Sequence, residues 1–240
     1  MANTFFQFKQ FVIHQDKCAM KVTTDGCLFG AWATHYLHQI EHKNSILDIG
    51  AGTGLLSLML AQQFKNSQIK AVEIQKEDFQ QCLENVQLST FSKNIQIEHT
   101  AIQELDLKQK FDIIISNPPF YQDHLKGPNV HKNKAHHHES LDFSSLSLNI
   151  KNRLETNGTF FLLIPYVQLH LIEKELNHQH LFIHHLCFAK QTEKHDYFRV
   201  MLTGGYKKND DTTTSEIIIK ENNIYTEKFK HLLAPYYLHF

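Results

Sequence analysis

The residues whose types and spacing could do chemistry begin with a short turn, Asn117-Pro118-Pro119-Phe120. It directly follows Phe111–Ser116, an apolar segment that is typical of a buried strand. Because proline has no N–H and fixes φ, the strand cannot continue, and the turn falls at its carboxyl end, where open α/β sheets bind ligands. The turn offers an amide side chain, a carbonyl outside the sheet and an aromatic face. Together these groups could hold a planar group that carries an NH₂.

A glycine-rich turn earlier in the chain is the second candidate element. An apolar strand over 45–49 runs into it, and the pattern predicts an amphipathic helix over 54–64. The glycines are Gly50, Gly52 and Gly54, which let the backbone approach a ligand and place N–H groups at a helix N-terminus. Because Asp48 stands two positions before the first glycine, the spacing favours a ligand with a positive amino group, as in S-adenosylmethionine (SAM). A nucleotide site and an empty structural turn are the alternatives.

A carboxylate ends the next predicted strand. Glu73 stands about 20 residues beyond the glycines, where a carboxylate can accept both ribose hydroxyls of an adenosine. Each such charge-assisted hydrogen bond contributes roughly 1.5–3 kcal/mol. The alternative is a solvated acid at a strand end. Asp48 and the glycines favour the ribose interpretation.

The length and composition of the chain fit one globular enzyme domain. At 240 residues with 42% hydrophobic content, it can bury a full core. We predict a single domain over 1–240, with an N-terminal segment at 1–44, a core at 45–206 and a C-terminal strand and helix at 207–240.

The apolar runs and cysteines indicate where the protein works. No apolar run reaches transmembrane length, and residues 1–9 lack the regions of a signal peptide. The four cysteines show neither metal-binding nor pairing spacings, which suits a reducing compartment; they are Cys18, Cys27, Cys82 and Cys187. We therefore expect a cytoplasmic protein without a membrane partner. The sequence does not give the oligomeric state, and a monomer is the expectation.

The overall charge argues mildly against a nucleic-acid partner, but its distribution does not. The formal net charge is −1, from 24 basic and 25 acidic residues, whereas nucleic-acid binders are usually more basic. Residues 124–138, however, contain Lys126, Lys132, Lys134 and five histidines, and no acid. This basic stretch follows the Asn-Pro-Pro-Phe turn, where an RNA backbone could be held.

The histidines do not predict a metal site. His136, His137 and His138 are adjacent, so their side chains point in different directions and lack the i, i+4 spacing of a helical site. A polar loop or helix start is the favoured interpretation, with weak RNA contact and zinc as alternatives.

The alternation of apolar patterns predicts a doubly wound, mostly parallel, seven-stranded α/β sheet of the Rossmann-like type. A helix is expected from the Thr23 to Gly26 cap to about Ile40. The seven predicted strands of the sheet lie at 45–49, 69–74, 95–98, 111–116, 159–165, 181–189 and 197–206. Short N-terminal and C-terminal additions flank this sheet, and the C-terminal addition contains a further strand at 216–220. The other predicted helices lie at 54–64, 76–90, 140–154, 166–178 and 225–233, with a polar linker at 209–215.

With these motifs in place, the chain resembles class I SAM-dependent methyltransferases that act on planar NH₂ groups. More narrowly, it resembles the bacterial tRNA1(Val) (adenine(37)-N6)-methyltransferase family, which methylates the adenine immediately 3′ of the anticodon. The resemblance runs nearly end to end and is carried by residues 8–11, 21–33, 46–60, 114–121 and 225–240.

The resemblance implies a role for each matching residue. Asp48 and Gly50 would hold the methionine part of SAM, Glu73 its ribose, and Asp25 and Gly26 would cover it from the N-terminal side. The full set of expected cofactor-binding residues is Asp25, Gly26, Asp48, Gly50, Gly52, Gly54, Glu73, Ile74, Ala101, Ile102 and Asn117. The expected catalytic residues are Asn117, Pro118 and Phe120, and the expected tRNA contacts are Pro119, Tyr121, Lys126, Lys132 and Lys134, with no metal.

Two positions depart from the pattern of the family. Ala101 stands where an Asp commonly meets the adenine amino group of the cofactor, so the Ile102 N–H or Gln103 would have to substitute. Ala135-His136 stands where Ala-Arg is common, which weakens any transfer of RNA-binding detail.

The chemistry that follows is methyl transfer to a poor nucleophile. Asn117 Oδ1 and the Pro118 carbonyl would accept the two N6 hydrogens of adenine, which localises the lone pair, while Phe120 stacks on the base. The cofactor carries the leaving group, so no acid–base pair is required.

Four other functions share parts of this pattern. A glutamine-N5 methyltransferase acting on a release factor uses the same turn, but carries a helical domain before the glycines, where this chain has about 45 residues. A guanine-N2 rRNA or adenine DNA enzyme is a further possibility, although no separate recognition domain is visible. A non-catalytic SAM- or RNA-binding module is the last.

Overall fold

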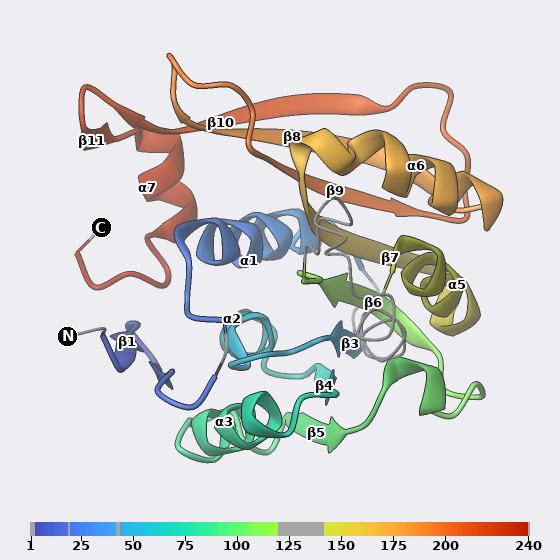
Figure 1. Cartoon of the computed structure of the whole chain (residues 1–240), viewed down its shortest axis with the longest axis horizontal. Coiled ribbons are helices and arrows are strands. Elements are labelled where there is room, and N and C mark those ends of the chain that lie inside the picture. Colours follow the sequence, from blue (N-terminus) through green and yellow to red (C-terminus); the bar gives the residue numbers. More distant parts are fainter. Residues whose placement is uncertain (1–2, 19, 42–43, 120–141, 240) are drawn as a thin grey trace, which may run out of the picture.

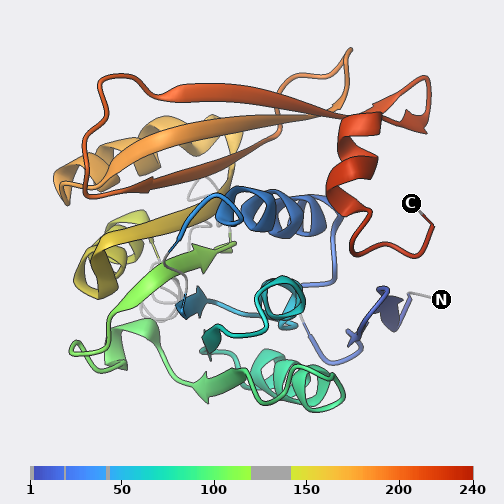
Figure 2. The same cartoon turned by 180° about the vertical axis from the view of Figure 1, so that it is seen from behind.

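The computed structural model describes residues 3–18, 20–41, 44–119 and 142–239. Its centre is a nine-stranded sheet with the order β11-β10-β8-β9-β7-β6-β3-β4-β5 (Figures 1 and 2). The strands are β3 (Ser45–Ile49), β4 (Gln68–Glu73), β5 (Ile95–His99), β6 (Phe111–Ser116), β7 (Leu154–Pro165), β8 (Phe182–Thr192), β9 (Arg199–Gly205), β10 (Thr213–Glu221) and β11 (Ile224–Tyr225). Strands β3 to β7 pair in parallel, and β9 is antiparallel to both β7 and β8.

The predicted fold class is confirmed, and the seven strands predicted for the core correspond to β3 to β9; the sheet has nine strands because the C-terminal addition joins it. The C-terminal addition does not stand apart: β10 pairs in parallel with β8, and β11 folds back on β10. The turn between them uses Asn222 and Asn223, both with positive φ (48° and 63°), which suits the tight turn of a hairpin. The expected linker at 209–215 therefore already enters β10 at Thr213, and Tyr225 belongs to a strand rather than to the last helix.

Helices cover both faces of the sheet, as the doubly wound prediction requires. They are α1 (Thr24–Leu37), α2 (Leu55–Gln63), α3 (Lys76–Gln87), α5 (Phe143–Arg153), α6 (Leu169–His178) and α7 (Glu227–Leu233), with 3₁₀ turns η1 (Ile102–Glu104) and η2 (Tyr166–Gln168). One core cluster joins the sheet to α1, α2, α3 and α7, and a second joins it to α5 and α6. Figure 1 shows these two groups of helices at opposite sides of the molecule.

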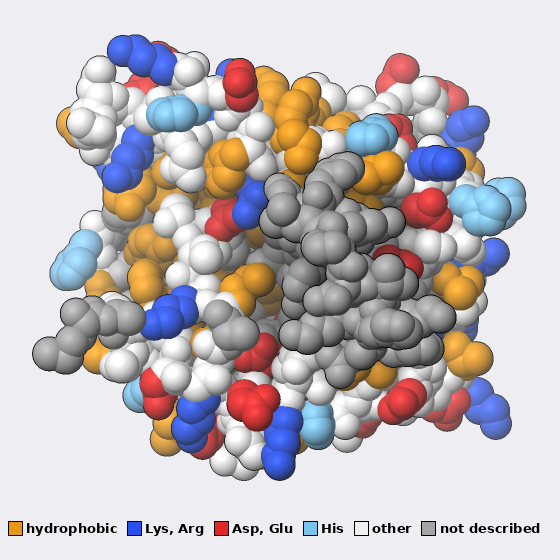
Figure 3. All heavy atoms as spheres, viewed as in Figure 1, with side chains coloured by type: hydrophobic (Ala, Val, Ile, Leu, Met, Phe, Trp, Pro, Cys, Tyr) orange, Lys and Arg blue, Asp and Glu red, His pale blue; other side chains and the backbone are white. Residues whose placement is uncertain are grey.

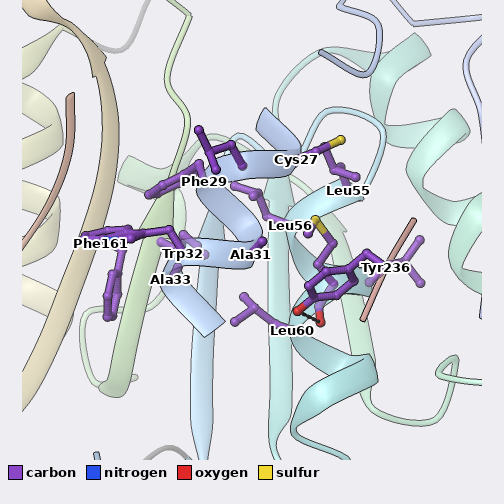
Figure 4. Packing of buried hydrophobic residues seen from close by; sticks show 14 of the residues in the cluster. Cys27, Phe29, Ala31, Trp32, Ala33, Leu55, Leu56, Leu60, Phe161 and Tyr236 are labelled. Carbon is purple, nitrogen blue, oxygen red and sulfur yellow. Dashed lines mark hydrogen bonds between the residues drawn. The ribbon is translucent and has the colours of Figure 1, made fainter. Parts of the chain in front are cut away.

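Helix α1 is held between α2 and the centre of the sheet. Its Trp32 ring packs edge-on against Phe161 of β7, with the ring centroids 5.9 Å apart. Gly30 allows the close approach to α2, because a Cβ there would stand 2.5 Å from the sulfur of Met59. The C-terminal Tyr236 closes the same layer: its hydroxyl donates to Thr34 Oγ1 at 2.8 Å (Figure 4 shows the packing).

The N-terminal segment forms a small separate hairpin, β1 (Phe5–Gln7) and β2 (Val12–His14). Asn85 of α3 fixes it, because Asn85 Oδ1 accepts from His14 N at 2.8 Å and Nδ2 donates to His14 O at 2.9 Å. The same Nδ2 donates to Thr53 O in the glycine turn at 2.9 Å. One fully buried amide therefore joins the N-terminal hairpin to the glycine turn.

In the described part of the chain, no helix is long and apolar enough to cross a membrane. Nor do three or more His, Cys, Asp or Glu side chains of the described residues gather into a group that could hold a metal ion.

We expect Tyr236→Phe to lower the free energy of unfolding by about 1 kcal/mol, because it removes a buried hydrogen bond to Thr34 without removing the ring. Urea unfolding followed by circular dichroism measures the change. Tyr166→Phe is the matched control, since Tyr166 is 40% exposed. Equal stability of the Tyr236→Phe protein and the wild type would contradict this role.

Candidate active site

The candidate site lies where three neighbouring parallel strands end at one edge of the sheet. Strand β3 lies between β4 and β6, with Ile49 paired to Val72 on one side and to Ser116 on the other. The glycine turn after β3, the carboxylate that ends β4 and the Asn-Pro-Pro turn after β6 are therefore neighbours. Ser116 Oγ donates to Ile49 O at 2.7 Å and ties the start of the Asn-Pro-Pro turn to the start of the glycine turn.

Asn117 carries the most informative side chain of the site. Its Oδ1 is buried and has no hydrogen-bond partner among the described residues. The start of α1 lies directly beside it, since a Cβ on Gly26 would stand 3.9 Å from Asn117 Nδ2. A buried acceptor without a donor costs stability, so this oxygen is expected to serve a bound ligand.

The three glycines of the turn differ in what surrounds them: two border open space and one permits close packing. All have positive φ, at 72° for Gly50, 55° for Gly52 and 82° for Gly54, a region that L side chains rarely adopt. A Cβ on Gly50 or Gly52 would meet no atom within 4 Å, whereas one on Gly54 would stand 2.9 Å from Cys82 Sγ. Gly50 and Gly52 thus line open space for a ligand, and Gly54 permits the packing of α3.

Glu73 is tied to the glycine turn by its own carboxylate. Oε2 accepts from Gly52 N and Oε1 from Gln75 N, both at 2.9 Å. Burial raises the pKa of Glu73 above its usual value, and these two N–H groups oppose that rise. Each oxygen keeps a lone pair, so the carboxylate is fixed in place and can still accept from a ligand's hydroxyls.

The carboxylate of Asp48 is buried next to the glycine turn and is hydrogen-bonded to α2. The residue is fully buried, and Oδ2 accepts from Ser57 Oγ of α2 at 2.7 Å. Burial raises the pKa of Asp48 to about 7, against the opposing effect of the Ser57 hydrogen bonds, with a smaller upward contribution from Glu73. Because Oδ1 has no partner in the described structure, it is the oxygen that a ligand's amino group could reach.

The carboxylate of Asp25 forms a long-range ion pair. Its Oδ2 accepts from Arg199 Nε at 2.7 Å, across 174 positions of the sequence, and the pair is largely shielded from solvent. This ion pair ties the first turn of α1 to the start of β9. Sequence reasoning did not find Arg199, because nothing local predicts a contact of this range.

The segment expected to meet the adenine of the cofactor is held from α5. Ile74 is 40% exposed and Ile102 is buried, while Ala101 precedes η1 as its N-cap. Gln103 Nε2 donates to Ser145 Oγ at 3.0 Å, so the orientation of its amide is fixed. Buried Arg153 donates to Leu105 O at 2.6 Å and holds the other end of the segment.

Several predicted site residues lie outside the described residues. These are Phe120, Tyr121, Lys126, Lys132 and Lys134, together with the run His136 to His138. Of the Asn-Pro-Pro-Phe turn, the structure therefore describes Asn117, the buried Pro118 and the exposed Pro119.

The described residues fit SAM, the cofactor that the resemblance implies. The open face of Gly50 and Gly52 leaves room for a ligand. Glu73 presents a fixed carboxylate, and the unpartnered oxygens of Asp48 and Asn117 supply acceptors. These groups suit an adenosine diol, an amino group and a substrate NH₂.

Comparison with known proteins points to one family. The family model described as methyltransferase small domain matches residues 33–142. A relative from Pseudoalteromonas translucida, named tRNA1(Val) (adenine(37)-N6)-methyltransferase, is 37% identical over 97% of this chain and 98% of its own. A relative of the same name from Dyadobacter fermentans is 50% identical over 68% of this chain and 66% of its own.

Solved structures agree on the fold. A predicted O-methyltransferase from Agrobacterium tumefaciens superposes with a TM-score of 0.63 at 16% identity, over 88% of this chain and 96% of its own. The ribosomal protein L11 methylase from Lactobacillus delbrueckii subsp. bulgaricus gives 0.51 at 18% identity, over 78% and 79%. At these identities the likeness concerns the fold alone.

We expect Asp48→Asn to flatten the pH dependence of stability of the ligand-free protein. The pKa of Asp48 is raised to about 7 from about 3.9 in an unfolded chain. The protonated Asp48 carboxyl therefore contributes to the free energy of unfolding in full below pH 4, and this contribution is lost as the pH rises through 7. Between pH 5 and pH 8 the wild type should lose roughly 3 kcal/mol more than the variant.

Urea unfolding at the two pH values measures this difference. Asp211→Asn, at an exposed position, is the control that should follow the wild type. If Asp48→Asn keeps the wild-type slope, the carboxyl is not held protonated in the free protein.

Proposed function

This chain belongs to the tRNA1(Val) (adenine(37)-N6)-methyltransferase family, and we propose that it transfers a methyl group from SAM to N6 of adenine 37, 3′ of the anticodon, in a valine tRNA. The observation that carries the proposal is the buried, unpartnered Oδ1 of Asn117 at the carboxyl end of β6. Asn117 follows β6 at the same edge of the sheet where the glycine turn follows β3 and Glu73 ends β4.

The cofactor would be held by the ends of β3 and β4. Glu73 accepts the ribose hydroxyls while Gly52 N and Gln75 N keep its carboxylate oriented. Gly50 and Gly52 leave room for the methionine part of SAM, and Asp48 Oδ1 accepts a hydrogen bond from its amino group. Bound SAM supplies an activated methyl group on sulfur together with the leaving group.

The cofactor's adenine would rest on Ile74 and the 101–105 segment. Since Ala101 has no carboxylate, the acceptor for the adenine amino group must come from a neighbour. Gln103 is suited to this, because its Nε2 is engaged by Ser145, which leaves Oε1 as the acceptor of the amide. The Ile102 N–H is the second polar group on this segment.

Asn117 and Pro118 would act on the target base. Asn117 Oδ1 and the Pro118 carbonyl accept the two N6 hydrogens, which draws the nitrogen lone pair out of conjugation with the ring and aims it at the methyl group. Positioning of this kind can contribute roughly 7–11 kcal/mol to lowering the barrier. Stacking by Phe120 would add about 1–3 kcal/mol against an unstacking cost of a few kcal/mol.

Asp25 and Gly26 would contribute through α1. The Asp25–Arg199 ion pair fixes the first turn of this helix, and Gly26 keeps the space beside Asn117 free of a side chain. We propose Pro119, Tyr121, Lys126, Lys132 and Lys134 as tRNA contacts from their position in the sequence.

A methyl-transfer assay tests the function. Labelled SAM is supplied with unmodified total tRNA, and the product nucleosides are identified by mass spectrometry. N6-methyladenosine at position 37 of a valine tRNA is the expected result. Label on a release-factor glutamine but not on RNA would replace this function with protein methylation. SAM binding without methyl transfer to any substrate would instead indicate a non-catalytic SAM-binding module.

We expect Asn117→Ala to lower kcat by at least about 100-fold, the usual scale for loss of one preorganised group that acts in the transition state. SAM affinity and thermal stability should stay close to wild type, because Asn117 Oδ1 makes no hydrogen bond within the described protein. Calorimetric titration with SAM and single-turnover methylation separate the two effects.

Asn209→Ala, at an exposed loop position, is the matched control and should retain full activity. Parallel losses of SAM affinity and turnover in Asn117→Ala would remove Asn117 from the role of base-positioning residue.

A further inference from the structure

The edge of the sheet continues from the catalytic turn into an exposed aromatic surface on the next strand. Ser116 of β6 pairs with Leu162 of β7. The strands are parallel, so Pro119 and Pro165 each stand three residues beyond that pair. Tyr166 and Val167 follow at once, in η2.

We propose that Tyr166 and Val167 form a stacking platform for the unpaired nucleotides that flank the target adenine in the tRNA. The inference rests on the proposed function and extends it, because it names the surface that receives the rest of the anticodon loop.

The platform is unusually exposed for apolar side chains. Tyr166 is 40% and Val167 72% exposed, and Leu171 in the first turn of α6 is 46% exposed. Figure 3 shows hydrophobic side chains gathered on this face, where β8 and α6 lie in Figure 1. Exposed apolar groups that gather beside a site commonly mark a contact surface.

The platform is also rigid, which distinguishes it from a loose surface side chain. The Tyr166 ring packs against Phe188 and Tyr197, with centroids 5.9 and 5.3 Å away. Its backbone N donates to Phe198 O at 3.2 Å. The rings beneath it are fixed in turn, since Tyr197 donates its hydroxyl to Glu216 at 2.7 Å. A ring held in advance loses little entropy when a base stacks on it.

A nucleotide is the occupant that fits the position. Enzymes that modify a base take it out of the stack, and its neighbours must then cross the adjacent edge of the sheet. Single-stranded bases stack readily on exposed aromatic rings. The same edge here carries the catalytic Asn117 one strand away.

The charges around the platform predict how it binds. The nearby hairpin carries Lys190 and Lys194 against Glu193 and Asp196, and Lys190 pairs with Glu216 at 3.3 Å. These charges nearly cancel, so the platform should bind bases by stacking rather than by neutralising phosphates.

The test compares three substitutions in the full-length protein: Tyr166→Ala, Tyr166→Phe and Val167→Ser. Affinity for an unmodified valine tRNA transcript is measured by fluorescence anisotropy. Tyr166→Ala should weaken tRNA binding roughly 5- to 150-fold, and Tyr166→Phe should retain wild-type affinity because the ring remains. Val167→Ser should give a smaller loss in the same direction.

Two further readouts separate stacking from a general structural effect. SAM affinity and kcat at saturating tRNA should be unchanged in Tyr166→Ala, with the loss confined to KM for tRNA. The slope of log affinity against log salt should match that of the wild type, since no phosphate contact is lost. Leu88→Ser, at a 73% exposed apolar position after α3, is the matched control and should bind tRNA normally.

The inference is overturned if Tyr166→Ala binds tRNA like the wild type, or if Tyr166→Phe binds as poorly as Tyr166→Ala. A changed salt slope would also overturn it, because it would assign the platform to phosphate contact. If Tyr166→Ala does not fold, undiminished tRNA affinity of Val167→Ser would overturn it. A wild-type protein that methylates no tRNA would instead reject the proposed function itself.

Discussion

The site depends on one constraint of the sheet: three adjacent parallel strands, β4, β3 and β6, must all leave it at the same edge. The chain leaves each of these strands through a different kind of turn. The chain after β3 turns through glycines with positive φ, and the chain after β6 is turned by prolines that cannot extend the ladder. The exit of β4 is stabilised by Glu73, which accepts a backbone N–H from the glycine turn and one from its own turn. The residues that end these strands are thus the same residues that we propose bind the cofactor and the substrate.

The buried acceptors at this edge of the sheet lower the stability of the protein without its ligands. Asp48 Oδ1 and Asn117 Oδ1 are buried acceptors without partners in the described structure, and each costs free energy in the unliganded protein. Asp48 bears a further cost, since burial disfavours its charged form. A protein selected for stability alone would fill these positions with apolar side chains. Acceptors kept unpaired are preorganised for donors that a ligand and a substrate bring.

Sequence reasoning predicted what is encoded locally. The strands Ser45–Ile49 and Phe111–Ser116 and the N-cap at Thr23 follow from short patterns of apolar, proline, glycine and threonine residues, and the structure confirms them. The ion pair of Asp25 with Arg199 joins residues 174 positions apart, and no local pattern marks such a pair. The strand β11 was missed because Ile224–Tyr225 is too short to show alternation and directly precedes a real helix.

The two ends of the chain also make long-range contacts that no local pattern marks. Lys9 N donates to Tyr236 O at 2.7 Å, and the Tyr236 hydroxyl reaches Thr34 of α1, so both ends pack on the layer that contains α1. The Arg199 ion pair fixes the start of that helix, which carries Gly26 beside Asn117. A small displacement of α1 would move its first turn into or away from the space beside the Asn117 amide. The terminal segments therefore support the helix whose first turn lies beside Asn117, and the N-terminal hairpin is also joined to the glycine turn through Asn85.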